Sequence, residues 1–366
     1  MDFAGLLFQW VNPRNDLRTD GFERFDGKYL VGGLRDDGVN IKIRKHVQPP
    51  PGWEDLRLCW IKYFSRGNAA GAVDLRQHFL LVLLGQTAAN GNTGWGSVLD
   101  QLNSGNCTLG VLGITSTDLQ DIPYRELNLI GKGAWLPSVG LDGGRIPEAV
   151  SLFLRDSKTL AREKEAILPL RDGNAALVAQ ARGFVMLRPY NAQSPIPAAG
   201  DPSQFIRQMS IFGLYKAYEQ AMQQATLAVA SALNKKGENR QNAQQGLMDL
   251  QEALAEFDAR YYFKSPVDPT RHELTKCANF FATYSTACSQ HADLSGQIER
   301  LGTLSRSELR AREEKADKQR DRRIQRNMAM IAVIALLFTA GQLLSQPPDQ
   351  FWEVLLQWLR LIGLGG

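Results

Sequence analysis

The chain has 366 residues, 44% of them hydrophobic, and a formal net charge of +4 at pH 7. This length allows a large core in two structural regions together with a further tail. The excess charge is local, because residues 306–326 hold nine Lys or Arg against five Asp or Glu and the remainder is neutral. A neutral remainder argues against the broad basic face of a nucleic-acid-binding protein, and no nucleic acid partner is expected.

The N-terminus and the cysteines indicate the compartment. Residues 1–7 lack the basic start and the long apolar run of a signal peptide, so none is expected. The four cysteines are widely spaced: Cys59, Cys107, Cys277 and Cys288. We therefore predict free thiols in a reducing cytoplasm.

Residues 1–200 are expected to form a cytosolic α/β domain. Alternating polar and apolar residues predict a strand at Asn40–Val47, and a dense apolar run predicts a buried strand at His78–Leu84. Apolar residues at helical spacing predict a helix at Trp53–Phe64. Further strands are predicted at Cys107–Ile114 and Gly183–Leu187.

From residue 201 the pattern becomes helical. Asp201-Pro202 is typical of a helix start, because aspartate caps the first turn and proline is tolerated there. Apolar residues at 3,4 spacing, interrupted at 234–239, then predict an antiparallel helix pair over residues 201–266.

A second start signal follows at Asp268-Pro269, with Thr270 and Glu273 spaced as a capping box. No proline occurs between Pro269 and Pro347, so one uninterrupted helix is predicted to run from the cytosol through the membrane. Its residues 268–326 are predicted to form a long stalk. Few of the later residues in this range are apolar, which indicates a solvated stalk or the wall of a wet, charged space.

Residues Met328–Leu344 are uncharged and mostly apolar. A helix needs about 17–25 such residues to cross a bilayer, so a transmembrane helix is predicted at 327–346, with a buried core helix as the alternative. Five cations precede it, against the single acid Asp321: Lys318, Arg320, Arg322, Arg323 and Arg326. Juxtamembrane cations stay in the cytoplasm near anionic headgroups, so they are expected to orient the chain with its N-terminal domain cytoplasmic.

The predicted order of elements is an α/β cytosolic domain, a helix pair, a long stalk, a membrane helix and a short tail. It resembles the CorA family of membrane cation channels, and Phe338-Thr339-Ala340-Gly341 is similar to that family's Phe-Ile-Ala-Gly motif. The resemblance implies a bacterial cell-membrane protein, five copies around a pore, and a divalent cation as cargo or cofactor. The family's Gly-Met-Asn filter falls on Leu344-Ser345-Gln346, and all three residues differ, which argues against a housekeeping magnesium transporter.

Small and polar residues recur at 3,4 spacing on one face of the predicted membrane helix: Ala332, Ala335, Thr339, Gln342 and Gln346. Such a stripe suits close contact between helices, where small side chains allow close approach. It also suits the wall of a narrow pore lined by hydrogen-bonding groups. The two roles can coexist in a ring of several copies.

Residues 350–366 are predicted to form a second, short membrane-associated helix. Glu353, Gln357 and Arg360 form one narrow polar face on an otherwise apolar stretch. The stretch is too short for an ordinary span, so an interfacial or re-entrant helix is predicted, with a short second span as the alternative.

Signals for catalysis and for metal binding are weak. His272, Cys277, Cys288 and His291 are zinc-ligand types, but on one straight helix Cys277 and His291 would lie ~21 Å apart, too far to share an ion. Gly131-Lys132-Gly133 lacks the glycine spacing of a phosphate loop. We therefore predict neither a catalytic residue nor a metal site.

The patterns favour an oligomeric channel or transport protein with a large cytosolic regulatory domain. The alternative is a membrane-anchored sensor or effector, such as the CorA-like proteins of prokaryotic defence systems, whose cytosolic domain binds a soluble ligand such as a nucleotide messenger. A tail-anchored enzyme is less supported. The helical region also predicts a ring of several copies, five if the resemblance holds.

Overall fold

The computed structural model describes residues 2–11, 21–44, 47–49, 53–64, 74–86, 99, 102, 109–110, 112–115, 117–119, 122–140, 148–155, 167–170, 175–188, 202–234, 240–344, 353 and 357. The chain divides into two compact units, Met1–Glu299 and Arg300–Gly366. The first unit contains a mixed sheet followed by helices, as the sequence predicts, and the described part of the second unit is helical. The unit boundary falls inside the predicted stalk.

The described strands of the first unit form one nine-stranded sheet in the order β2-β3-β4-β5-β1-β6-β9-β8-β7. Their bounds are β1 Asp2–Trp10, β2 Glu23–Phe25, β3 Val39–Arg44, β4 Asp55–Tyr63, β5 Gln77–Gln86, β6 Leu127–Gly140, β7 Ile167–Leu170, β8 Ala175–Gln180 and β9 Gly183–Arg188. All neighbouring strands are antiparallel except β6 and β9, which run parallel. The two longest strands, β5 and β6, lie on either side of β1 at the centre of the sheet, where both faces can be covered.

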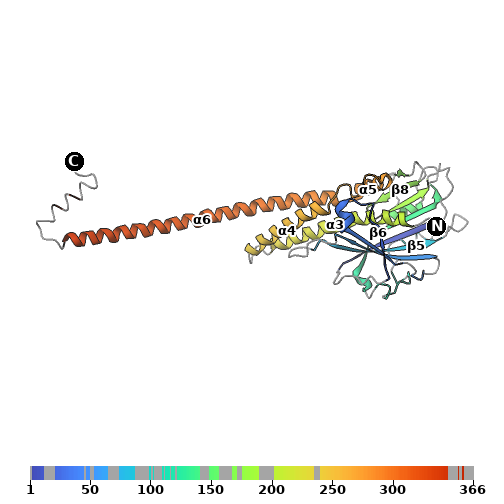
Figure 1. Cartoon of the computed structure of the whole chain (residues 1–366), viewed down its shortest axis with the longest axis horizontal. Coiled ribbons are helices and arrows are strands. Elements are labelled where there is room, and N and C mark those ends of the chain that lie inside the picture. The colour runs from blue at the N-terminus through green and yellow to red at the C-terminus, as the bar shows by residue number, and fades with distance from the viewer. Residues whose placement is uncertain are drawn as a thin grey trace. The chain divides into compact units, whose positions relative to one another are not determined.

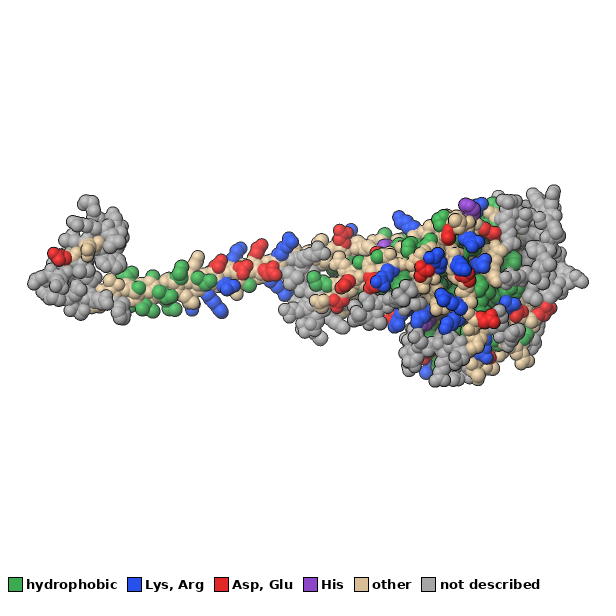
Figure 2. Space-filling model, in the orientation of Figure 1, with side chains coloured by type: hydrophobic (Ala, Val, Ile, Leu, Met, Phe, Trp, Pro, Cys, Tyr) green, Lys and Arg blue, Asp and Glu red, His purple; other side chains and the backbone are tan. Residues whose placement is uncertain are grey.

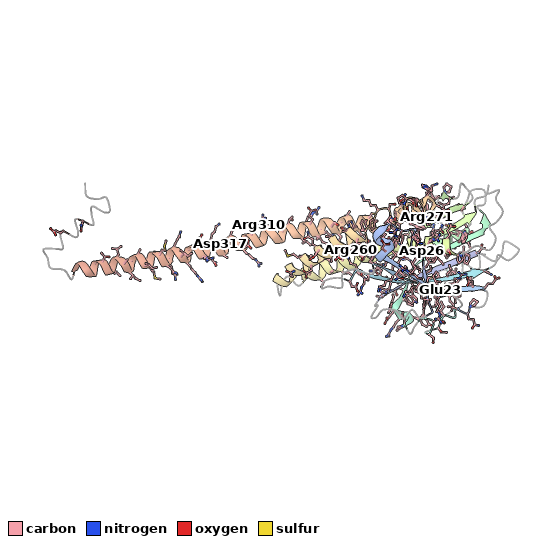
Figure 3. All side chains as sticks on the ribbon, viewed as in Figure 1. Glu23, Asp26, Arg260, Arg271, Arg310 and Asp317 are labelled. Atoms are coloured by element: carbon pink, nitrogen blue, oxygen red, sulfur yellow. The ribbon has the colours of Figure 1, made fainter. Side chains whose placement is uncertain are left out.

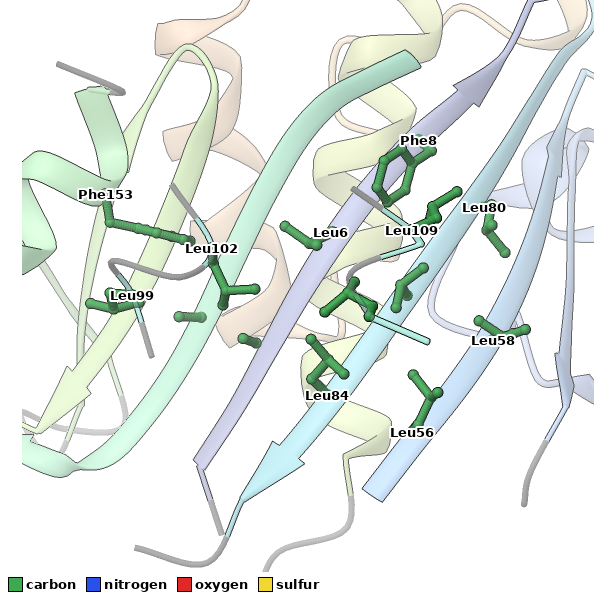
Figure 4. Close-up of a cluster of buried hydrophobic side chains, with 14 of the residues drawn as sticks. Leu6, Phe8, Leu56, Leu58, Leu80, Leu84, Leu99, Leu102, Leu109 and Phe153 are labelled. Carbon is green, nitrogen blue, oxygen red and sulfur yellow. The ribbon is translucent and has the colours of Figure 1, made fainter. Parts of the chain in front are cut away.

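One face of the sheet packs against helix α2, Glu148–Arg155, and against leucines from the segment between β5 and β6 (Figure 4). Leu99, Leu102 and Leu109 of that segment are buried in the same core cluster as Leu6 and Phe8 of β1. Apolar burial at roughly 25 cal/mol per Å² is the main stabilising term for such a layer.

The other face packs against helix α3, Ser203–Asn234, and helix α5, His272–Tyr284 (Figure 1). Glycines allow this close approach. A Cβ at Gly131 would lie 2.5 Å from Cε1 of Phe212, and one at Gly133 would lie 2.5 Å from Sδ of Met209. The Gly131-Lys132-Gly133 sequence thus belongs to β6, and its two glycines leave room for α3.

Helix α4, Arg240–Arg260, packs against α3 beside an aromatic cluster. Phe64 follows β4 with a φ of 60°, a backbone conformation that costs a non-glycine residue about 1–2 kcal/mol. Its buried ring stacks on Tyr218 of α3 and meets Phe257 of α4 edge to face. This packing holds the strained residue in place.

Two local predictions in the α/β region are wrong. Residues Trp53–Phe64 contain strand β4 instead of a helix, because the strand is buried on both faces and so lacks an alternating pattern. The described residues of Cys107–Ile114 form turns, with Gly113 at a φ of +68°, and no strand. The predicted strands near β3, β5 and β9 and the helices α3 and α4 are confirmed.

The single long helix predicted after Pro269 is two helices. Helix α5 ends at Tyr284, Ser285 is extended, and helix α6 spans Ala287–Leu344. The predicted capping box is also absent, because the N-cap residue of α5 is Arg271 and makes no side-chain capping bond. Asp268 instead accepts hydrogen bonds from the backbone N–H and the hydroxyl of Thr270.

Buried tyrosines predict instability at high pH. Burial raises the pKa of Tyr29, Tyr63 and Tyr218 above the ordinary value of 10.0. The unfolded chain releases these protons near pH 10, whereas the folded chain keeps them. The tyrosines therefore leave the free energy of unfolding unchanged below pH 10 and lower it as the pH rises beyond 10. Absorbance at 295 nm should report tyrosinate formation together with unfolding. Gradual ionisation at pH 10 in a folded chain would contradict this prediction.

Candidate functional site

The second unit contains a helical stretch that can cross a membrane. Among the described residues, only Arg310–Gly341 of α6 is long and apolar enough, judged by length and composition. None of its most apolar part is buried within the structure. This burial differs from that of a soluble core helix, which was the alternative interpretation of Met328–Leu344.

Large apolar side chains are exposed around the whole circumference of this helix. Figure 2 shows a group of them on the face in view. The exposed set is Met328, Met330, Ile331, Val333, Ile334, Leu336 and Leu337. Leu336 is 71% exposed, although leucine is normally among the most buried residue types. A contiguous exposed apolar surface of this kind marks contact with lipid or with another protein.

The structure places most of the small and polar stripe on this helix. Ala332 and Ala335 are exposed and Thr339 is half-buried. The Thr339 hydroxyl donates to the Ala335 carbonyl oxygen at 2.7 Å, so its hydrogen-bonding capacity is partly used within the helix. The backbone of Gln342 is part of helix α6, but its side chain is not described. Gln346 lies outside the described residues.

The predicted orienting cations all lie on exposed turns of α6: Lys318, Arg320, Arg322, Arg323 and Arg326. No ion pair or hydrogen bond of these five side chains occurs within the described residues. Figure 3 labels Arg310 and Asp317 on the same charged part of the helix. Of the predicted helix 350–366, only Glu353 and Gln357 are described, and both are helical and exposed.

A carboxylate of α3 holds the start of α6. Glu219 is only 8% exposed and accepts hydrogen bonds from the Ser285 hydroxyl at 2.9 Å and from the Thr286 backbone N–H at 3.0 Å. Its other oxygen pairs with Nζ of Lys216 at 2.7 Å. The Ser285 hydroxyl in turn accepts from the Ala287 N–H at 3.1 Å. A negative charge beside the N–H groups at a helix N-terminus is favourable, so Glu219 stabilises the start of α6 at this point.

Replacing Glu219 by alanine is expected to loosen this joint. Hydrogen bonds to a charged group contribute about 1.5–3 kcal/mol each, and the Thr286 N–H would lose its partner. Hydrogen exchange should accelerate at the amides of residues 286–290, while Glu219→Gln, which keeps an acceptor oxygen, should change it much less. Equal protection in both variants would show that the carboxylate does not hold the joint.

The zinc-ligand residue types are separated. Cys277 is buried near Gln208, whereas Cys288 is exposed. Nε2 of His291 lies 2.7 Å from Oδ1 of Asp258, and its ring stacks on Tyr262. Within the described ranges, no group of three His, Cys, Asp or Glu side chains is arranged to hold a metal ion.

The cysteines should differ strongly in reactivity. Burial raises the pKa of the Cys59 thiol to about 12, so almost no thiolate is present at pH 8. Cys277 is buried too, and Cys288 is exposed. Iodoacetamide at pH 8, followed by peptide mass spectrometry, should modify Cys288 in the folded chain and the other two only after unfolding. Rapid modification of Cys59 in the folded chain would contradict the prediction.

The first unit also has a charged surface depression of about 580 Å³. Its lining residues come from β2, the turn after it and the π-helical turn η1, Leu34–Gly38: Arg24, Asp26, Gly27, Lys28, Arg35 and Asp36. Asp26 pairs with Lys28 at 3.6 Å and Asp36 with Arg35 at 2.9 Å. Sequence patterning did not identify this depression, because its residues come together only through the turn.

Glu219 was likewise not identified from the sequence. It is one acid within a helical stretch, and its partners Ser285 and Thr286 are far from it in the chain. Comparisons with protein-family models, with curated proteins and with solved structures found no match to this chain. No relative therefore assigns a role to the residues described above.

Proposed function

We propose that this chain is the membrane-anchored subunit of an oligomeric channel or transport-like protein with a large cytosolic regulatory domain. The observation that carries the proposal is the exposed apolar surface on all sides of α6 between Met328 and Leu337. In water this surface is costly, and in a bilayer it needs no partner from the chain. The cations of residues 318–326 favour an orientation in which the first unit lies in the cytoplasm and α6 enters a bacterial cell membrane.

Oligomerisation follows from the stripe. One helix cannot enclose a pore, but several copies can turn Ala332, Ala335 and Thr339 toward one another, with lipid against the bulky residues. The mixed charges of residues 310–326 can also pair between parallel copies. We therefore propose a homo-oligomeric ring, a pentamer if the CorA-like order of elements reflects the assembly.

The ion is not the usual one of that family. Leu344-Ser345-Gln346 supplies a single side-chain amide where the family has its asparagine filter. A divalent cation remains the candidate cargo or cofactor, but housekeeping magnesium uptake is not proposed. Magnesium rescue of a transport-deficient strain would contradict this part of the proposal.

Conductance is the direct test. The full-length chain in a planar bilayer should conduct, and Ala335→Phe should reduce the current at least about tenfold by filling the narrow stripe. Leu337→Phe adds the same ring to the opposite side of the helix and should leave the current unchanged. Mass photometry in detergent should give a multiple of 40.7 kDa. A monomer, or silence from a correctly assembled oligomer, would overturn the proposal.

The charged depression favours a second candidate. A membrane-anchored sensor or effector would bind a soluble ligand on the first unit. Arg24, with Lys28 and Arg35 beside it in ion pairs with Asp26 and Asp36, supplies positive charge for the phosphates of a nucleotide messenger. Nucleotides should then raise the melting temperature of the full chain, and the shift should disappear in Arg24→Gln. Genes of a defence system beside this gene would support the same candidate, and no shift with any nucleotide would count against it.

A further inference from the structure

Within residues 311–326 of α6, the acids and the cations lie on different sides of the helix. Eighteen residues of an α-helix make five full turns, so residues 18 apart lie on the same side. Asp317 is 18 residues before Ala335, and Asp321 is 18 residues before Thr339. These acids therefore continue the side of the helix that carries the small and polar stripe.

The arginines nearest the apolar segment lie on the other side. Arg326 is 18 residues before Leu344, on the side away from the stripe. At about 100° per residue, Arg322 and Arg323 lie to either side of Arg326, within about 60° of it. We call Arg322, Arg323 and Arg326 the basic side. Between residues 311 and 326 no acid lies on this side, and Glu308 lies on it about 27 Å before Arg326.

The basic side is available for contact. The three side chains are exposed, and no ion pair within the described residues occupies them. At the standard helix rise, the three arginines lie about 3–9 Å along the helix axis before Met328, the first residue of the apolar segment. That distance corresponds to the headgroup layer, which adds roughly 5–8 Å to each side of a ~30 Å hydrocarbon core.

We propose that the basic side docks on the headgroups of anionic phospholipids in the cytoplasmic leaflet, with Asp317 and Asp321 turned away from the lipid. Charge complementarity and continuity with the exposed apolar surface carry this inference. Basic residues next to a bilayer are drawn to anionic lipid, and the bulky apolar side chains extend the same surface into the hydrocarbon. The inference rests on the proposed membrane function. It adds which side of α6 faces the lipid and that the bound lipids are anionic.

A positional swap tests the side, because it leaves the net charge unchanged. In Arg323→Ile with Ile324→Arg, one cation moves by a single residue from the basic side to the stripe side. The full chain would be reconstituted in vesicles of phosphatidylcholine with one-fifth phosphatidylglycerol, and the lipids retained after mild detergent extraction would be measured by mass spectrometry. Phosphatidylglycerol should be enriched on the unaltered chain and on Arg323→Lys. The swap should lower its preferential binding about fivefold, as should Arg323→Gln.

The outcomes separate this inference from the proposed function. Extraction of the chain from vesicles by alkaline carbonate would refute the membrane function itself. Stable insertion without phosphatidylglycerol enrichment, or with equal enrichment on the swap variant, would overturn the lipid-facing basic side alone. If Arg323→Gln, which places no charge on the stripe side, changes the oligomeric mass but not the lipid ratio, the basic side is a contact between copies, and the inference is overturned as well.

Discussion

Leu336→Arg is expected to move the protein out of the membrane fraction. Leu336 lies at the middle of Met328–Leu344 and is 71% exposed, so an arginine there meets no steric obstacle in the chain. In water the change would be harmless, but at the centre of a membrane helix arginine costs about 2.5–3.5 kcal/mol. We therefore expect the insertion equilibrium constant to fall by roughly two to three orders of magnitude. Alkaline carbonate extraction of membranes from expressing cells measures the fraction inserted.

A matched control separates this effect from solubility in general. Leu304 is 61% exposed and lies in the same helix, outside the predicted membrane segment. Leu304→Arg makes the same chemical change and should leave the membrane fraction unaltered. If both variants distribute like the unaltered chain, the apolar segment of α6 does not lie in lipid.

Gly131→Ala is expected to destabilise the first unit by about 1–3 kcal/mol. The added Cβ would lie 2.5 Å from the Phe212 ring, which is packed between Phe184 and Phe281 and cannot move away freely. Overpacking of a dense core costs energy of this size. Urea denaturation of the full chain, followed by tryptophan fluorescence, should show a lower midpoint.

Gly246→Ala is the control for this prediction. Gly246 lies in helix α4 and has nothing within 4 Å of its added Cβ. Alanine is preferred over glycine in a helix interior by about 1 kcal/mol, so the same substitution should stabilise the chain slightly. Equal effects at the two glycines would mean that α3 does not depend on the space above β6.

Several elements could be predicted from short stretches of sequence, because the residues within each stretch determine its structure. The 3,4 spacing of apolar residues identified α3 and α4, and the dense run at His78–Leu84 identified β5. The apolar part of α6 was found from length and composition alone. Each of these signals belongs to one continuous segment, so no partner in the fold is needed to interpret it.

Strand β4 shows where local reading fails. Its two faces are both buried, with Leu58 and Trp60 on one and Cys59 and Ile61 on the other. The resulting apolar run has no period of two, and its spacing happened to fit a helix. Only its pairing with β3 and β5 makes it a strand.

The candidate site divides in the same way. The sequence by itself determined the apolar segment of α6, its small and polar stripe and the cations before it, because these depend only on composition and helical spacing. Only the tertiary structure decided that β6 needs Gly131 and Gly133, that Arg24 and Arg35 line one depression, and that α5 and α6 are separate helices. Each of these depends on atoms brought together from distant parts of the chain, as when Glu219 accepts the Thr286 N–H, and no local pattern records such contacts.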